Sequence, residues 1–233
     1  MTRAWLRSLP FGTPEVPDAD LPHADSVPDE VFLRWLAAAV AAGAPDPQVC
    51  VLSTVRVRPR PVDAHAIDGG ASQVADLAGP GGSVAADARV VTVRDVGTGS
   101  WWFSGPGRSP KAVQLQEFPS AALTFYWAVH GRQVRVRGPV ALDSDSAATD
   151  FLDRSETARR VAAGSRQSAV LDDPDDYAAA VAAADPNVVP PDWGTWRLRA
   201  TEVEFWQANP GARHQRWLFT RSAQRWDLAV LWP

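Results

Sequence analysis

The sequence predicts a mainly β protein with helices packed around its sheet. Apolar runs of strand length recur along the chain, for example at 90–93 and 101–103. Apolar and polar residues alternate in the segments 133–137, 216–220 and 225–231, as expected for strands with one buried face. Glycine and proline residues separate these runs, which favours strands joined by turns.

The composition is that of an ordinary globular protein. A chain of 233 residues, 45% of them hydrophobic, can bury the core of one domain with extensions. The formal net charge of −4 argues against a general nucleic-acid-binding protein. The single cysteine, Cys50, lies in an apolar run and is expected to be a buried thiol. Neither it nor the four histidines show metal-ligand spacing, so we expect no metal site.

No apolar run approaches the length needed to span a membrane. The N-terminal segment lacks the apolar stretch of a signal peptide. We therefore expect a cytoplasmic protein with no membrane partner and a small-molecule substrate.

The N-terminal third is expected to contain one helix, one strand and two irregular segments. Residues 1–28 are rich in Pro and Asp with little periodicity, so we predict a loosely ordered arm. A helix is predicted over 29–42, where apolar residues share one side, and a strand over 47–57. A Gly/Ala/Asp/Pro-rich loop insert follows at 58–88. It is either a mobile surface loop or a lid or dimer contact. Residues 29–233 are expected to form a single domain.

The middle of the chain predicts strands around one phosphate-binding loop. After the strand at 90–93 and a turn at Gly97 and Gly99, a second strand covers 101–103. Proline and glycine make 104–111 irregular. A short helix over 112–117 leads to a strand at 121–129, a turn at 130–131 and the strand at 133–137.

The irregular loop has the features of an anion site. Ser109 is placed to cap the following helix and Pro110 suits its first turn. The free N–H groups at that helix start, with Arg108 and Lys111, would face a phosphate. Lys111 is the single lysine in a chain rich in arginine. The alternative is a lysine that remains by chance on a solvated loop.

The C-terminal half predicts three helices and five further strands. Its strands are expected at 139–142, 196–198, 203–207 and in a final hairpin, 216–220 with 225–231. Its helices are expected near 144–154, with Ser144 or Ser146 as cap, and at 155–163 and 172–184. The expected architecture is a Greek-key-like barrel surrounded by helices.

Several spaced motifs occur in an order that resembles the pyridoxamine 5′-phosphate oxidase family. The motifs are Arg89, Trp102-Phe103-Ser104, Ser109-Pro110-Lys111, Phe125-Tyr126-Trp127, Arg132-Gln133-Val134, Gly164-Ser165-Arg166-Gln167-Ser168 and Glu204-Phe205-Trp206-Gln207 followed by His214 and Arg216. The resemblance covers about Phe32 to Pro233. It implies an FMN-binding split β-barrel and an obligate homodimer whose flavin sites use segments of both subunits.

The resemblance implies a set of FMN-binding residues. These are Arg89, Arg94, Phe103, Ser104, Arg108, Ser109, Lys111, Gln133, Gln167, Ser168, Trp206 and Arg216. Arg89 and Lys111 correspond to phosphate ligands, which suits a bidentate guanidinium. The loop departs from the family because Pro110 stands before Lys111 with one residue inserted, and Arg108 is expected to supply the missing guanidinium. Arg89 as a surface charge, Gln133 as a polar strand position and Trp206 as plain core remain alternatives.

At the implied substrate site, fewer residues match the family's residue types than at the cofactor site. Its residues are Arg94, Asp150, Arg154, Arg213 and His214. Asp150 stands where the family has tyrosine, Ala158 where it has serine and Ala212 where it has arginine. A carboxylate at Asp150 would repel a substrate phosphate or pair with Arg154 four residues on. His214 is the expected catalytic residue, which orients or deprotonates substrate; a structural histidine is the alternative.

The resemblance implies an FMN-dependent oxidase of pyridoxine or pyridoxamine 5′-phosphate, with hydride transfer to the flavin and reoxidation by dioxygen. One alternative is an FMN-dependent oxidase of a dihydroaromatic intermediate in phenazine-like biosynthesis, favoured by Asp150, Ala158 and Ala212. Another is a non-catalytic flavin-binding module. Fold alone does not decide among them.

Overall fold

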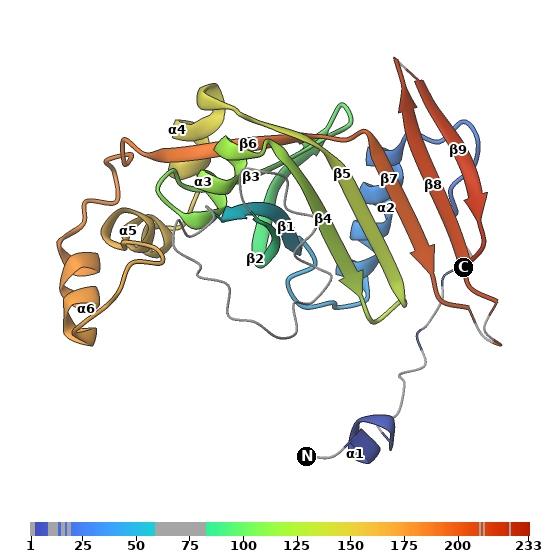
Figure 1. Cartoon of the computed structure of the whole chain (residues 1–233), viewed down its shortest axis with the longest axis horizontal. Coiled ribbons are helices and arrows are strands. Elements are labelled where there is room, and N and C mark those ends of the chain that lie inside the picture. The colour runs from blue at the N-terminus through green and yellow to red at the C-terminus, as the bar shows by residue number, and fades with distance from the viewer. Residues whose placement is uncertain are drawn as a thin grey trace, which may run out of the picture.

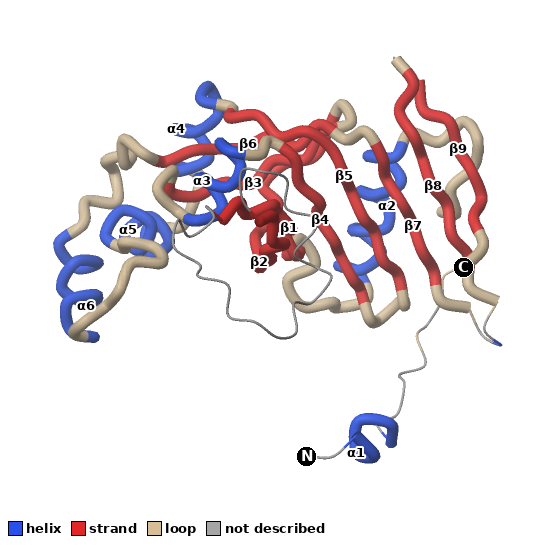
Figure 2. Tube along the Cα trace, viewed as in Figure 1, coloured by secondary structure: helices blue, strands red, loops and turns tan. Residues whose placement is uncertain are grey.

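The computed structural model describes residues 3–8, 14, 17, 20–58, 83–209, 211, 213–223 and 225–233 (Figures 1 and 2). Part of the expected arm at 1–28, most of the loop insert at 58–88, and Ala212 lie outside the described residues. The end of the arm packs on the body: the Trp35 indole donates a 2.8 Å hydrogen bond to the Asp20 carbonyl, and Leu21 contacts the core. Residues 3–8, expected to be loosely ordered, instead form a short helix that lies apart from the sheet in Figure 1.

Six antiparallel strands close into a barrel. They are β1 (Val49–Arg58), β2 (Ser83–Gly97), β3 (Ser100–Pro106), β4 (Ser120–Trp127), β5 (Arg132–Leu142) and β6 (Trp193–Arg199). Their order is β4-β1-β2-β3-β6-β5, and β5 pairs back with β4. Because β4 returns to lie beside β1 after three consecutive neighbours, the Greek-key prediction is confirmed.

Three more strands extend the sheet from β5. They are β7 (Glu202–Gln207), β8 (Gln215–Ser222) and β9 (Arg225–Leu231), paired in that order. The β5 strand is shared: residues 132–137 pair with β7, whereas 140–142 pair with β6. Gly138 lies at the change of partner, and a Cβ there would collide with the Arg199 carbonyl. Glycine is therefore required where one strand serves two sheets.

Of the helices described, all but the first cover the barrel or one end of the molecule. The helices are α1 (Arg3–Ser8), α2 (Pro28–Ala41), α3 (Pro110–Glu117), α4 (Ser144–Leu152), α5 (Glu156–Gly164) and α6 (Pro174–Ala183). Figure 1 shows α4, α5 and α6 gathered at the end of the sheet opposite β8 and β9. Helix α2 crosses behind β5 and β7 in the same view. No helix in the described part of the chain is long and apolar enough to span a membrane.

The core joins the barrel to its extension through α2. Phe32 has its ring centroid 4.7 Å from that of Phe125 inside the barrel. Trp35, one turn later on the same face, packs edge-on against Phe205 of β7 at 5.1 Å. Cys50 is buried as expected, and burial raises the pKa of its thiol to about 12.

Several element boundaries and one cap differ from the prediction. The insert ends earlier, because 83–88 pair with β1 as the start of β2. Residues 104–106, predicted irregular, continue β3 because β6 supplies their ladder partners. The segments 133–137 and 139–142 form one strand. Asp143, rather than Ser144 or Ser146, occupies the N-cap position of α4.

Candidate functional site

Three cations from distant parts of the chain approach one another at one end of the barrel. They are Arg89 of β2, Lys111 of α3 and Arg154, just past the end of α4. Burial, followed by the positive charges of Arg89 and Arg154, lowers the pKa of Lys111 to about 8. An anion placed among these groups would relieve their repulsion.

Lys111 is the most confined of the three. Its side chain is buried, and its Nζ donates to Ser109 Oγ and Gln167 Oε1, both at 3.2 Å. No carboxylate lies within ion-pairing distance of it among the residues the structure describes. A Cβ at position 105 would lie 2.6 Å from Nζ, so Gly105 leaves the space that the ammonium occupies. Pro110 opens α3 at its first position and Ser109 occupies the N-cap position, as predicted, but the Ser109 side chain makes no capping hydrogen bond.

Arg89 is fixed by partners that the sequence did not reveal. It donates to Thr54 Oγ1 at 2.5 Å and to Gln114 Oε1 at 2.7 Å, and it pairs with Asp87 at 2.8 Å. A hydrogen bond from Gln114 lowers the pKa of the Asp87 carboxyl. Gln114 lies three residues after Lys111 on the same helix face, a spacing that could have identified it.

A cavity of about 420 Å³ opens beside Lys111. Its lining is Arg108, Pro110, Arg166, Gln167, Ser168 and Ala169. Three predicted cofactor residues therefore share one cavity. Arg108 differs from the prediction in one respect: it pairs with Asp192 at 3.2 Å and donates to the Ser165 carbonyl at 3.4 Å. Its guanidinium is thus already partnered and half exposed.

A second cluster has Asp150 at its centre. Arg94 Nε donates to Asp150 Oδ1 at 2.8 Å, and Arg154 Nη2 contacts Oδ2 at 3.2 Å. The predicted pairing of Asp150 with Arg154 is confirmed. The β2–β3 register shifts between Val93 and Asp95, and such an irregularity redirects the side chain of the residue between them, here Arg94.

Trp193 completes this second cluster and was not found from the sequence. Its indole donates to Asp150 Oδ2 at 3.2 Å and its ring lies 4.8 Å from the Arg154 guanidinium carbon. Burial raises the pKa of the Asp150 carboxyl, but the hydrogen bond from Arg94 and the charge of Arg154 outweigh this and hold the pKa below its ordinary value. Arg154 Nη2 also donates to Ser104 Oγ at 2.6 Å, which links this cluster to β3.

Phe103 does not line the cation cluster. Its side chain is fully buried in the barrel and stacks on Trp196 at 6.1 Å. Alternation along β3 turns Ser104 toward Arg154 and Phe103 toward the core. The Phe103 side chain therefore faces away from this cluster, and its role as a cofactor-binding residue stays a prediction.

The other predicted cofactor residues lie on the strands β5, β7 and β8, away from the cation cluster. Gln133, Trp206 and Arg216 face one another across β5, β7 and β8. Arg216 pairs with Glu204 at 2.9 Å, and this bond raises the pKa of Arg216. Figure 1 places β7 and β8 at the opposite end of the sheet from α4. Within one chain, the predicted site residues therefore lie in two separate groups, one near α4 and one on the β7–β8 extension.

His214 belongs to this second group. Its ring lies 5.0 Å from the Trp206 ring, and its Nδ1 accepts a hydrogen bond of 3.3 Å from the Asn209 backbone N–H. Arg213 is exposed, and its carbonyl accepts from the Asn209 side chain. Asn209 thus fixes the loop that carries both residues.

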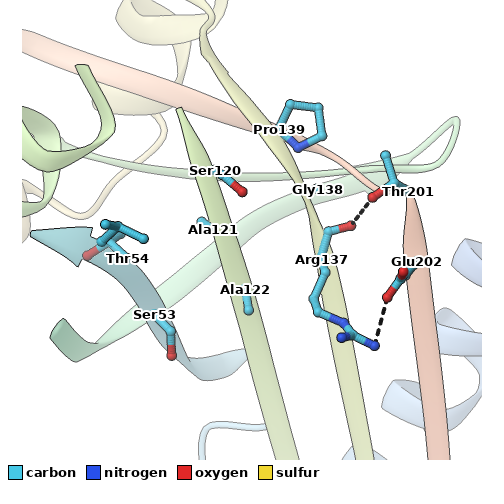
Figure 3. A pocket seen from close by; sticks show the side chains of 11 residues that line it. Ser53, Thr54, Ser120, Ala121, Ala122, Arg137, Gly138, Pro139, Thr201 and Glu202 are labelled. Atoms are coloured by element: carbon cyan, nitrogen blue, oxygen red, sulfur yellow. Dashed lines mark hydrogen bonds and ion pairs between the residues drawn. The ribbon is translucent and has the colours of Figure 1, made fainter. Parts of the chain in front are cut away.

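Another cavity, of about 540 Å³, lies on the outer face of β1, β4 and β5 (Figure 3). The Arg137–Glu202 ion pair of 2.8 Å and the hydrogen bond from Thr201 Oγ1 to the Arg137 carbonyl border it. None of the predicted site residues lines it. Of its lining residues, Thr54 is the one that touches the site, through its hydrogen bond with Arg89.

The fold and the site together define a class. The closed six-stranded barrel of this chain is the fold of the pyridoxamine 5′-phosphate oxidase-like split barrels. The chain belongs to the pyridoxine/pyridoxamine 5′-phosphate oxidase family, a family of oxidoreductases. Residues 193–233 match the family model described as the pyridoxine 5′-phosphate oxidase C-terminal dimerisation region.

Relatives match over nearly the whole chain. A pyridoxine/pyridoxamine 5′-phosphate oxidase from Burkholderia cenocepacia is 31% identical over 92% of this chain and 94% of its own length. The enzyme of that name from Thermosynechococcus vestitus is 32% identical over 88% of this chain and 89% of its own.

Solved structures agree with this assignment. The crystal structure of PhzG from Burkholderia lata, in complex with tetrahydrophenazine-1-carboxylic acid, has a TM-score of 0.73 at 25% identity, covering 95% of this chain and all of that one. A pyridoxamine 5′-phosphate oxidase-related, FMN-binding protein from Nostoc punctiforme has a TM-score of 0.65 at 19% identity, covering 90% and 99%. The second match shows the fold alone.

Proposed function

We propose that the protein is an FMN-dependent oxidase of a small cyclic substrate. The observation that carries the proposal is Lys111, a buried ammonium with no carboxylate in ion-pairing distance among the described residues. A buried charge without a counter-ion is costly, so this position favours an anionic ligand. When bound, FMN would accept a hydride from the substrate and pass the electrons to dioxygen.

The residues present fit the phosphate of FMN. Lys111 and Arg89 supply positive charge, while Ser109, Gln167 and Ser168 supply hydrogen bonds around the adjoining cavity. The cavity beside Lys111 gives a phosphate room to approach. Gln133, Trp206 and Arg216 would meet the ring of the flavin, because their outward row offers a flat aromatic surface with polar neighbours.

The two halves of the site support a homodimer. Lys111 and Arg154 lie near α4, whereas Trp206 and His214 lie on the β7–β8 extension at the other end of the sheet. The extension falls in the segment that matches a dimerisation region. A second copy could bring its extension to the cation cluster of the first, which would complete two equivalent sites. Light scattering on the FMN-loaded protein should therefore give the mass of two chains, and a monomer with full FMN affinity would contradict this arrangement.

His214 is the proposed proton-handling residue. Because Nδ1 accepts a hydrogen bond from the Asn209 N–H, the neutral ring carries its proton on Nε2. Nε2 is then the atom that can donate to a bound substrate and orient it. The Trp206 ring holds the imidazole in place from one side.

Two substrates are candidates. The relatives at 31–32% identity carry the name pyridoxine/pyridoxamine 5′-phosphate oxidase, which favours a vitamin B6 phosphate. The PhzG structure holds a tetrahydrophenazine carboxylic acid, which favours a partly reduced aromatic ring. The pairing of Asp150 with both Arg94 and Arg154 supports the second candidate, since these arginines would otherwise receive the substrate phosphate.

Anaerobic titration of FMN-reconstituted protein tests the proposal. The yellow absorbance should bleach on adding pyridoxine 5′-phosphate or a dihydrophenazine carboxylate, and recover in air. Bleaching by the first substrate would favour the B6 reaction, and bleaching by the second alone the ring oxidation. Failure to take up FMN at all would reject the proposed function.

The affinity for FMN is expected to fall about tenfold between pH 7 and pH 9. Burial and neighbouring cations lower the pKa of Lys111 to about 8. The ammonium that binds phosphate is therefore present below pH 8 and is lost above it. A phosphate monoester is already dianionic through this range, since its second pKa is about 6. Flavin fluorescence titrations at each pH measure the effect, and an affinity that stays constant would contradict it.

A further inference from the structure

Asp150 occupies the position between two guanidinium groups. Its carboxylate is almost fully buried, with its side chain 8% exposed. Oδ1 accepts from Arg94 Nε at 2.8 Å, while Oδ2 accepts from Arg154 Nη2 at 3.2 Å, Arg154 Nε at 3.3 Å and Trp193 Nε1 at 3.2 Å. One internal carboxylate thus satisfies both arginines, and the cluster retains a single positive charge.

The adjoining cavity is acidic. A volume of about 460 Å³ opens beside Arg94 and Asp150, and Arg94 is its one basic lining residue. The other lining residues are Asp95, Trp102, Asp143, Ser146, Thr149, Asp150, Asp153 and Thr195. Trp102 donates its indole N–H to Asp143 at 2.8 Å, which fixes the ring at the wall. Such a cavity offers an aromatic surface and repels a dianion.

We infer that the substrate is a ring compound without a phosphate group, neutral or carrying a single carboxylate, and that Asp150 sets this selectivity. The inference rests on the proposed FMN-dependent oxidase and specifies its substrate class. A phosphate would have to displace Asp150 from both arginines. The displaced carboxylate would then stay buried beside a dianion without its partners, a costly arrangement. A neutral ring needs no such exchange.

The test compares pyridoxine 5′-phosphate with pyridoxine on the FMN-loaded protein, by calorimetric titration without oxygen. The wild type is expected to bind the phosphate ester no more than about threefold tighter than pyridoxine, or to bind neither. Asp150→Asn keeps the shape of the side chain and releases both arginines from its charge. It should raise the affinity for the phosphate ester by about 10- to 100-fold, the effect of one charge-assisted hydrogen bond. The affinity for pyridoxine should not change.

Asp153→Asn is the matched control. Asp153 is exposed at the end of α4 and lines the same cavity, but no ion pair joins it to Arg94 or Arg154 in the described structure. It should leave the affinity for the phosphate ester within about threefold of wild type. An equal gain in both variants would mean that general charge, and not the position of Asp150, sets the selectivity.

Two outcomes overturn the inference. One is a wild-type protein that binds the phosphate ester at least about 100-fold tighter than pyridoxine. The other is a folded Asp150→Asn variant, judged by its thermal transition, that gains no affinity for the ester. If that variant does not fold, the wild-type comparison still decides. FMN uptake is measured separately, so a failure of the proposed function appears as absent flavin rather than as a changed preference between the two ligands.

Discussion

Replacing Lys111 with methionine is expected to weaken FMN binding by at least about 100-fold. The variant keeps the aliphatic side chain and removes the buried ammonium that contacts Ser109 and Gln167. Hydrogen bonds from a charged donor contribute about 1.5–3 kcal/mol each, and an ammonium can direct more than one toward a phosphate. Quenching of FMN fluorescence measures the dissociation constant.

The same variant is expected to remain folded without FMN. An ammonium whose pKa is lowered to about 8 destabilises the folded state at neutral pH, because the unfolded chain holds its proton more tightly. Removing it should leave the melting temperature of the apoprotein unchanged or higher. Loss of both FMN binding and the folded state would contradict this account.

Arg108→Ala serves as the control for Lys111. Arg108 is half exposed and already pairs with Asp192, so its removal should change FMN affinity by less than about threefold. A loss as large as that of the Lys111 variant would restore the sequence-based prediction that Arg108 binds the phosphate.

Replacing Trp35 with alanine is expected to lower the free energy of unfolding by about 4 kcal/mol. The Trp35 side chain is fully buried and packs edge-on against Phe205 at 5.1 Å and Trp217 at 6.4 Å. The Arg132 guanidinium carbon also lies 4.2 Å from its ring. The loss combines a cavity with a stranded hydrogen-bond acceptor at the Asp20 carbonyl. Urea denaturation followed by tryptophan fluorescence measures it.

Leu33→Ala provides the comparison on the same helix. Leu33 is 43% exposed, so truncation there should cost less than about 1 kcal/mol. Similar losses in both variants would mean that helix propensity, rather than the contact between α2 and the β7–β8 extension, sets the stability.

Much of the fold could be predicted because the strands show their exposed and less exposed faces in the local sequence pattern. Alternation in 133–137 and in the last two strands reflects one face that is less exposed than the other, which the sequence records directly. The strand at 83–88 could not be found, since its small residues are held by pairing with β1 rather than by their own preference. The continuity of β5 through Gly138-Pro139 depends likewise on its neighbours on both sides.

The site was harder to predict from the sequence because its side chains are brought together by contacts between distant segments. Lys111 and Ser109 could be predicted because they stand at a helix start that follows a glycine-rich loop. Asp87 and Trp193 carry no comparable signal, and they matter because the fold brings them to Arg89 and Asp150. Strand alternation also turns Ser104 toward the cations and Phe103 toward the core. The sequence motif alone does not show which of the two side chains faces which side of the strand.

The burial of Cys50 affects how the protein resists oxidation by peroxide. An oxidase of the proposed kind releases hydrogen peroxide, and peroxide attacks thiolates far faster than thiols. The one cysteine of the chain is buried on β1, and its pKa of about 12 keeps it protonated. The chain thus offers peroxide no ionised cysteine sulfur to oxidise, and we expect that turnover by the proposed reaction would not inactivate the protein through cysteine damage.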